Sequence, residues 1–177
     1  MLLTTSRCVL RPWRLDDAAA LAAEANDPRI AAQTRDVFPN PYTLADAQAF
    51  LASAVDEEPP TRFAITVDDV VAGGIGWIPG TDVSRVTAEV GYWLGTAWWG
   101  RGIAQDALAA VSTALLRPGT GFERLEAIVF VGNDASARVL ERCGYVQEAV
   151  MRRSAIKHGV VRDQYLYARV RDRAPEP

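Results

Sequence analysis

The sequence has 177 residues, of which 49% are hydrophobic and 23% are charged, and its formal net charge is −3. This length suits one domain with a sizeable core, and the composition is that of an ordinary globular protein. The chain has no apolar run near the ~20 residues of a membrane span and no basic excess that would favour nucleic acid. We expect no secretory signal. We expect a single cytoplasmic domain over residues 1–177, with residues 171–177 as a flexible tail and neither nucleic-acid nor membrane partners.

The two cysteines, Cys8 and Cys143, are too few and too far apart to indicate a disulfide framework or a zinc site. Only one histidine is present to assist them. We expect both thiols to be buried as small apolar groups, and we expect no metal.

The first quarter of the chain predicts a short strand followed by a helix. Residues 8–12, "CVLRP", read as the strand. Asp16 or Asp17 then caps a helix, which stops at Asp27-Pro28.

A proline-rich loop, "VFPNPYT", leads into a second helix. Thr43 with Asp46 three residues later is a capping box, and apolar residues at helical spacing continue to Ala54. The segment "RFAITVDDVVAGGIGWI" then gives two β-rich runs on either side of Asp68-Asp69, which predicts a hairpin.

The second half alternates strands and helices. Residues 86–94, "VTAEVGYWL", form a strand, and the stretch "WWGRGIAQDA" starts a helix that ends at Arg117-Pro118. Residues 124–131 are apolar on both faces, as expected of a covered strand. Asn133 caps the following helix, and Gly144 suits a left-handed C-cap.

The tail reads as two long strands around "KHG", with His158 in the turn. The full order is therefore β, α, α, β, β, β, α, β, α, β, β. It predicts an α/β or α+β domain with a mostly antiparallel sheet and one or two parallel crossovers.

The stretch "WWGRGIAQDA" has two readings when it is taken alone. The glycines can serve a tight strand-to-helix turn, or they can let a diphosphate approach the main chain. Small residues at 100, 102 and 104, the free N–H groups of a helix start and the charge of Arg101 suit the second reading. The stretch is neither a Walker loop nor a dinucleotide fingerprint.

Four segments in order resemble the GNAT superfamily of N-acetyltransferases, in particular its RimJ/RimL-like branch. They are "LRPW" with Asp16, "EVGYWLGTAWWGRGIA", "NDASARVLERCGY" and "GVVRDQYLYA". The resemblance covers nearly the whole chain. It implies a mixed, mostly antiparallel seven-stranded sheet, splayed between the strands at 86–94 and 124–131 and flanked by about four helices.

The resemblance also implies a site for acetyl-CoA, and no metal. Main-chain N–H groups of the glycine loop would hold the pyrophosphate, and the end of the preceding strand would pair with the pantetheine arm. The first slot of the family's loop pattern, usually Arg or Gln, holds Trp99 here. The residues implied to bind the cofactor are Tyr92, Trp93, Leu94, Trp99, Gly100, Arg101, Gly102, Ile103, Ala104, Asn133, Ser136 and Arg138.

The chemistry requires a neutral amine, a route for its proton and a hydroxyl near the sulfur. Many superfamily members place a tyrosine seven residues after the asparagine, but this position is Leu140. Ser136 is then the candidate hydroxyl, with Asn133 bonding the pantetheine amide. Glu89 is the candidate base, with Glu126 a second choice, although Glu89 also fits a structural carboxylate.

Three functions fit these features. The first is an acetyl-CoA-dependent N-acetyltransferase that works by direct attack in a ternary complex on a protein or peptide N-terminus. The second acetylates a small amine such as an antibiotic, polyamine or amino acid, and the third is a non-catalytic CoA-binding module. Acceptor choice is expected to lie in residues 30–43 and in the last hairpin, and the tail strands could mediate a homodimer.

Overall fold

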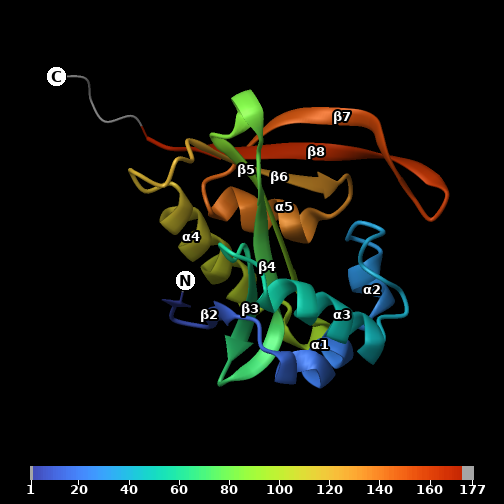
Figure 1. Cartoon of the computed structure of the whole chain (residues 1–177). Helices are drawn as coiled ribbons and strands as arrows, with labels where there is room; N and C mark the ends of the chain where they lie inside the picture. The colour runs from blue at the N-terminus through green and yellow to red at the C-terminus, as the bar shows by residue number, and fades with distance from the viewer. Residues whose placement is uncertain (1, 173–177) are drawn as a thin grey trace.

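A computed structural model describes residues 2–172 of the chain. Its centre is an eight-stranded sheet in the order β1-β2-β3-β4-β5-β6-β8-β7 (Figure 1). Neighbouring strands are antiparallel except for β5 and β6, which are parallel. The strands are β1 (Leu3–Thr4), β2 (Val9–Pro12), β3 (Arg62–Val67), β4 (Val70–Pro79), β5 (Thr87–Leu94), β6 (Arg124–Phe130), β7 (Val146–Lys157) and β8 (Val160–Val170).

The mixed, mostly antiparallel sheet is confirmed, with one strand more than predicted. The extra strand, β1, has two residues, which pair with β2 through Leu3↔Leu10 and Thr4↔Val9. A run of two residues is too short to show the alternation by which a strand is recognised in a sequence.

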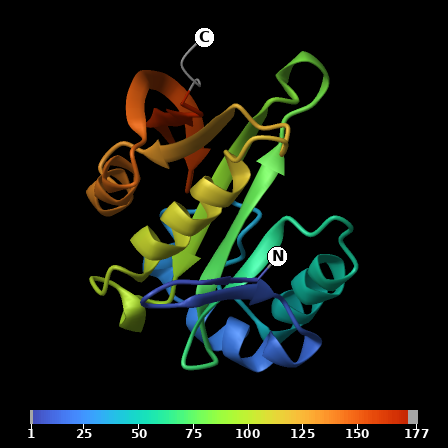
Figure 2. The same cartoon turned by 90° about the vertical axis from the view of Figure 1, so that its left-hand side faces the viewer.

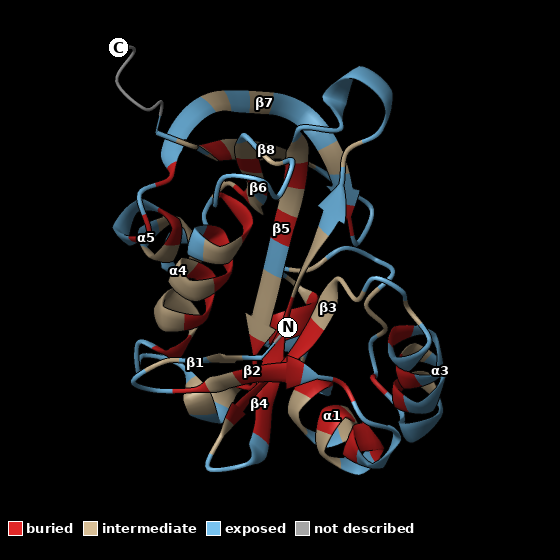
Figure 3. Ribbon diagram, turned by 60° about the vertical axis from the view of Figure 1, so that its left-hand side comes forward, coloured by how far each residue is buried: buried red, intermediate tan, exposed pale blue. Residues whose placement is uncertain are grey.

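The helices are α1 (Ala18–Ala25), α2 (Pro28–Ala31), α3 (Leu44–Val55), α4 (Ile103–Leu115) and α5 (Asp134–Arg142). They cover both faces of the sheet, with α4 and α5 on one face and α1 and α3 on the other (Figure 3). Helix α2 was not predicted. It is a single turn of four residues that starts with Pro28 after the cap Asp27, so the proline that stops α1 also begins α2.

Three of the turn and cap predictions are confirmed, whereas the predicted cap of α1 by Asp16 or Asp17 is wrong. Thr43 and Asp46 form the capping box of α3, and Gly144 follows α5 with φ +80°. Asp68 and Asp69 both have positive φ, at 49° and 63°, which is the geometry of a tight two-residue hairpin turn.

Asp17 precedes α1, but its carboxylate does not cap that helix. It accepts hydrogen bonds from Arg11 at 2.8 and 2.6 Å and from the Arg14 N–H at 2.9 Å. Both partners of this ion pair are buried, with Arg11 at 6% and Asp17 at 7% exposure. Burial alone would raise the pKa of Asp17, but the hydrogen bonds from Arg11 and Arg14 outweigh it and lower that pKa.

Strands β5 and β6 separate soon after they meet. They pair at only three positions, from Thr87↔Arg124 to Glu89↔Glu126. Beyond Glu89, β5 stays paired with β4 as far as Leu94, while β6 stays paired with β8 as far as Phe130. Each strand follows its antiparallel neighbour, and β6 turns away from β5 (Figure 2). The predicted splay between these two strands is confirmed.

Further predictions from the sequence concerned membrane spans, metal sites, the two cysteine thiols and the C-terminal tail. No helix within residues 2–172 is long and apolar enough to cross a bilayer, and the same residues hold no group of three His, Cys, Asp or Glu side chains that could bind a metal. Cys8 and Cys143 are buried free thiols, as predicted. Of the predicted tail, residues 173–177 lie outside the described residues, and the Arg171 N–H donates to the Glu123 carbonyl at 2.8 Å.

Candidate active site

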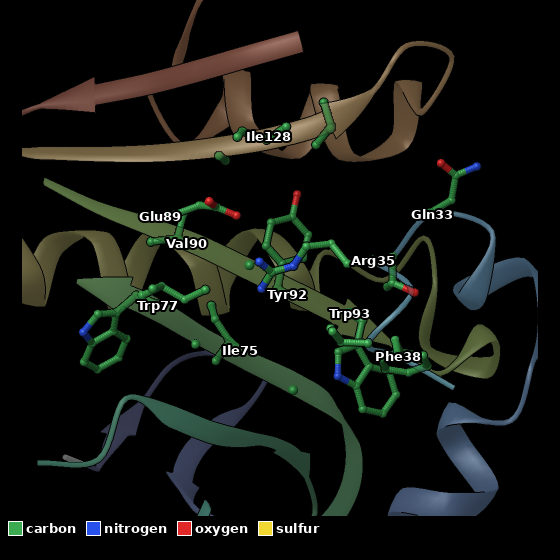
Figure 4. Close-up of a pocket in the computed structure, with 18 of the residues that line it drawn as sticks. Gln33, Arg35, Phe38, Ile75, Trp77, Glu89, Val90, Tyr92, Trp93 and Ile128 are labelled. Atoms are coloured by element: carbon green, nitrogen blue, oxygen red, sulfur yellow. The ribbon is translucent and has the colours of Figure 1, made fainter. Parts of the chain in front are cut away.

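A cleft of about 860 Å³ opens where β5 and β6 part. Its walls come from β4, β5 and β6, from the first turn of α5, from residues 33–38 and from the end of β7. The three predicted catalytic residues, Glu89, Asn133 and Ser136, lie together in its lining, with the predicted cofactor residues Tyr92 and Trp93. The cleft therefore brings side chains from these six separate parts of the chain to one place (Figure 4).

The glycine loop before α4 exposes a row of main-chain donors. Gly100 and Gly102 have φ of +73° and +76°, values that residues other than glycine rarely adopt. The N–H groups of residues 100–105 have no acceptor within residues 2–172, and the first bond of the helix is donated by Asp106 to the Gly102 carbonyl. Such a set of free N–H groups at the start of a 13-residue helix suits an anion.

Two arginines stand beside this loop. The Arg101 guanidinium lies 5.2 Å from the centre of the Trp98 ring. Arg7 pairs with Asp106 at 2.9 Å, and a methyl group on Gly102 would lie 3.2 Å from its Nε. Sequence reasoning missed Arg7, because its partner Asp106 is 99 residues away and nothing in the local pattern connects the two.

The Asn133 side chain caps α5 and also keeps a free hydrogen-bond donor. Its side-chain oxygen accepts from the Ser136 N–H at 3.2 Å, which makes it the N-cap of α5. Its amide nitrogen and the Ser136 hydroxyl have no hydrogen-bond partner among residues 2–172, and both residues line the cleft. The helix cap therefore leaves one amide donor and one hydroxyl free to meet a ligand.

The cleft also contains a tyrosine side chain that sequence reasoning did not single out. The family resemblance implied only a main-chain role for Tyr92. Its side-chain hydroxyl reaches from β5 to α5 and donates to the Ser136 carbonyl at 3.3 Å. Burial raises the pKa of Tyr92 far above its ordinary value, so the group stays protonated. Leu140 lies in the same lining, where the superfamily resemblance led us to look for a tyrosine.

The two candidate bases differ in their surroundings. Glu126 is tied to Arg124, whose Nε donates to it at 2.7 Å. Glu89 lies on β5 at the last position that pairs with β6, and its carboxylate makes neither an ion pair nor a hydrogen bond with any side chain in residues 2–172. The reading of Glu89 as a carboxylate paired across the sheet therefore has no support in the geometry.

The other predicted cofactor residues lie outside the cleft lining, apart from Trp93. The Leu94 carbonyl accepts from the Trp99 indole N–H at 2.9 Å, so that carbonyl already has a partner. Arg138 is exposed on α5. Ile103 is buried beneath the glycine loop, with Ala104 beside it in the same helical turn.

One end of the cleft is formed by residues 33–38, which follow α2. Asp36 accepts from Lys157 at 2.7 Å, and Lys157 is the only lysine in the sequence and 4% exposed. This contact joins the loop to the tip of the β7–β8 hairpin (Figure 1). Arg35, next to Asp36, points into the cleft (Figure 4).

A family model described as "Acetyltransferase (GNAT) domain" matches residues 7–146, which include the glycine loop, Glu89 and Asn133. The chain belongs to the GNAT acetyltransferase family. The predicted membership of the GNAT superfamily is confirmed, and RimL and the RimJ of Mycobacterium smegmatis, at 20% and 24% identity, share the fold of this chain.

This GNAT chain is similar to three proteins of different description. It is 29% identical to the uncharacterized N-acetyltransferase p20 of Bacillus licheniformis over 94% of both chains. RimL, a ribosomal L7/L12 α-N-protein acetyltransferase solved with CoA, superposes with a TM-score of 0.84, at 20% identity over 96% of this chain and 98% of RimL. MccE, a microcin C7 self-immunity acetyltransferase solved with acetyl-CoA and AMP, superposes with a TM-score of 0.81, at 25% identity over 94% of this chain and 93% of MccE.

In the closing hairpin of this GNAT domain, Arg162 and Asp163 contact the loop before α5 and do not line the cleft. Arg162 donates to the Val131 carbonyl at 3.0 Å, and the Asp163 carbonyl accepts from the Val131 N–H at 3.0 Å. Both contacts hold the β6–α5 loop just before Asn133. His158 is an exposed turn residue with φ +51°, as predicted.

Proposed function

We propose that this GNAT acetyltransferase uses acetyl-CoA to acetylate the N-terminal amine of a protein or peptide by direct attack in a ternary complex. The observation that carries this proposal is the cleft itself. It brings an unpaired carboxylate, Glu89, to the same space as the free hydroxyl of Ser136 and the free amide of Asn133. A carboxylate on a strand and hydrogen-bond donors on a helix line the same cleft, and acyl transfer from a thioester to an amine uses a base and a donor of these kinds.

The residues present fit CoA. The free N–H groups of residues 100–105 suit a pyrophosphate, and Arg7 and Arg101 add positive charge beside them. The cleft itself runs along the separated edge of β5, from Glu89 to Trp93, and includes Asn133, whose amide nitrogen is free to donate to an amide carbonyl. When bound, acetyl-CoA supplies an acetyl thioester, whose C–S bond breaks as the C–N bond to the amine forms.

The chain's own groups then take up the proton of the amine and stabilise the thiolate that leaves. Glu89 accepts the proton that the attacking amine loses, either directly or through water. Ser136 donates a hydrogen bond toward the sulfur that leaves, and Tyr92, kept protonated by burial, stands behind it at the Ser136 carbonyl. Donors fixed by the start of a helix lose little energy in reorganising during the reaction.

Exposure at the mouth of the cleft supports a large acceptor. Val37, in the loop that forms this end, is 83% exposed, so a chain that enters with its N-terminus can continue into solvent. The likeness to MccE supports a second candidate, a small amine, because MccE was solved with AMP. The two candidates share the donor site and differ only in what fills the acceptor end.

A thiol-release assay with acetyl-CoA tests the proposal. The acceptors are peptides with free N-termini, the same peptides with blocked N-termini, and a panel of amino acids, polyamines and aminoglycosides. We expect release with the free peptides alone, and mass spectrometry should place the acetyl group on the α-amine. Release with small amines only would favour the second candidate, and CoA binding without release would favour a non-catalytic module.

A further inference from the structure

Two charged groups in the cleft have no charged partner in the part of the chain that the structure describes. One is Glu89, and the other is Arg35. The remaining charges of the lining are neutralised in pairs, Lys157 with Asp36 at 2.7 Å and Arg62 with Glu57 at 3.2 Å. The lining therefore presents one free carboxylate and one free guanidinium.

The backbone that carries Arg35 is anchored on both sides. The Phe38 N–H donates to the Arg35 carbonyl at 2.9 Å, and the Phe38 ring lies 5.4 Å from Trp93 and 5.0 Å from Tyr42. Asp36 is held by Lys157. Arg35 is thus an exposed side chain on a fixed stretch of loop, and its guanidinium extends into the cleft (Figure 4).

Arg35 and Glu89 make no ion pair with each other, although they line one cleft. A ligand that occupies the space between them therefore meets opposite charges at its two ends. An ammonium group satisfies Glu89, and a planar carboxylate satisfies a guanidinium through two parallel hydrogen bonds. The acceptor that matches both is an amine with a carboxylate a short distance away.

We propose that the enzyme selects peptide N-termini that carry an aspartate or glutamate at the first or second residue, and that Arg35 binds that side chain. The inference rests on the proposed peptide acetyltransferase function, which supplies the amine for Glu89. A free amino acid also carries both charges, but it would leave unused the open end of the cleft around Val37.

The test compares two peptides that differ in one group, an acidic peptide with aspartate at residue 2 and a neutral one with asparagine there. We expect kcat/KM for the acidic peptide to be higher by roughly 10- to 100-fold, because a charge-assisted bidentate contact is lost in the neutral peptide. Arg35→Gln should abolish this preference by lowering kcat/KM for the acidic peptide only. Arg35→Glu should reverse the preference toward a peptide with lysine at residue 2, and KM for acetyl-CoA should not change in either variant.

Arg117→Gln is the matched control, since Arg117 is an exposed arginine just past the end of α4. It should keep the wild-type preference.

Three results would overturn the proposal. Equal use of both peptides by the wild type would do so while leaving peptide acetylation standing. An equal loss on both peptides in Arg35→Gln would show that Arg35 does not read the acidic side chain. Arg35-dependent acetylation of free aspartate or glutamate, with no acetylation of any peptide, would refute the peptide acceptor and with it the proposed function.

Discussion

The two ends of the cleft are built in different ways. The donor end consists mainly of main-chain groups and helix starts, namely the first turn of α5 in the cleft lining and the glycine loop outside that lining. The acceptor end consists of side chains from distant segments, and the contact between Asp36 and Lys157 spans 121 residues. In the proposed function, the donor end binds acetyl-CoA, and the acceptor end carries the side chains that select the amine.

This difference predicts separable effects of substitution. Changes at the donor end should alter CoA binding or turnover for every acceptor alike. Changes at the acceptor end should alter KM for the amine and leave CoA binding intact. The following variants test that separation, from the largest expected effect to the smallest.

Asp17→Asn should destabilise the fold that carries both ends, by about 3–5 kcal/mol, because it leaves the buried Arg11 without its charged partner. The pKa of Asp17 is lowered on folding, so its contribution is complete above the unfolded pKa of about 4 and is lost as pH falls through the folded value. Denaturant unfolding from pH 7 to pH 2 should therefore show the difference between wild type and variant shrinking on acidification. Asp16→Asn, at an exposed neighbour, is the control, and equal stability of the two variants would contradict the account.

Glu89→Gln should lower kcat by roughly 100-fold or more, since general base catalysis typically contributes that much. The Kd for CoA should stay unchanged. The loss should diminish at higher pH, where more of the acceptor amine is already neutral. Glu126→Gln removes the carboxylate that pairs in register with Glu89, and it should leave kcat near the wild-type value; similar losses in both variants would mean that Glu89 has no special role.

Gly102→Val should raise the Kd for CoA by roughly 10-fold or more, as measured by calorimetry. A valine would have to leave the φ of +76° or bear its strain, and its side chain would approach Arg7. Gly119→Val has a similar positive φ, +89°, in a turn remote from the cleft, so it reports the effect of strain alone. Undiminished CoA binding by Gly102→Val would remove the glycine loop from the donor site.

Ser136→Ala should lower kcat by roughly 10-fold with little change in the Kd for CoA, because a single neutral hydrogen bond to the departing sulfur is lost. The N–H of residue 136, which Asn133 caps, remains in place in the variant. Ser84→Ala, in an exposed turn, serves as the control. Steady-state turnover equal to that of the wild type would exclude the hydroxyl from the reaction.

Lys157→Met should raise KM for the acceptor by roughly 3- to 10-fold, which makes it the smallest of these effects. It keeps the apolar stem of the buried side chain but releases Asp36 and the loop that positions Arg35. The Kd for CoA should not change. Arg152→Met, at an exposed position of the same strand, is the control, and a parallel rise in the Kd for CoA would show that the two ends are not separable.

The donor end could be predicted from the sequence because its geometry is local. Two glycines, a following helix and an asparagine three residues before a serine fix their own backbone conformations, so the pattern in the sequence reports the structure directly. The splay between β5 and β6 was implied by the family resemblance, and its physical cause, the pairing of each strand with its own antiparallel neighbour, became visible only in the structure.

The acceptor end could be assigned to segments of the sequence, but its side-chain contacts could not be predicted. Residues 30–43 and the last hairpin were expected to select the acceptor, and Arg35, Asp36 and Lys157 do lie in those segments. Nothing in the local pattern indicates that the single lysine is buried against the loop, or that Arg35 is left unpaired. Pairings between distant side chains depend on the assembled sheet, and the same applies to Arg7 with Asp106 and to the Tyr92 hydroxyl at α5.

The central claim is that both substrates meet in the one cleft where β5 and β6 part. A bisubstrate conjugate, in which CoA is joined through an acetyl bridge to the N-terminus of an acidic peptide, tests it directly by calorimetry. The account predicts that the conjugate binds at least 100-fold more tightly than CoA, because the second contact becomes intramolecular, and that Arg35→Gln removes much of that gain. A conjugate that binds no more tightly than CoA would show that the acceptor does not occupy this cleft.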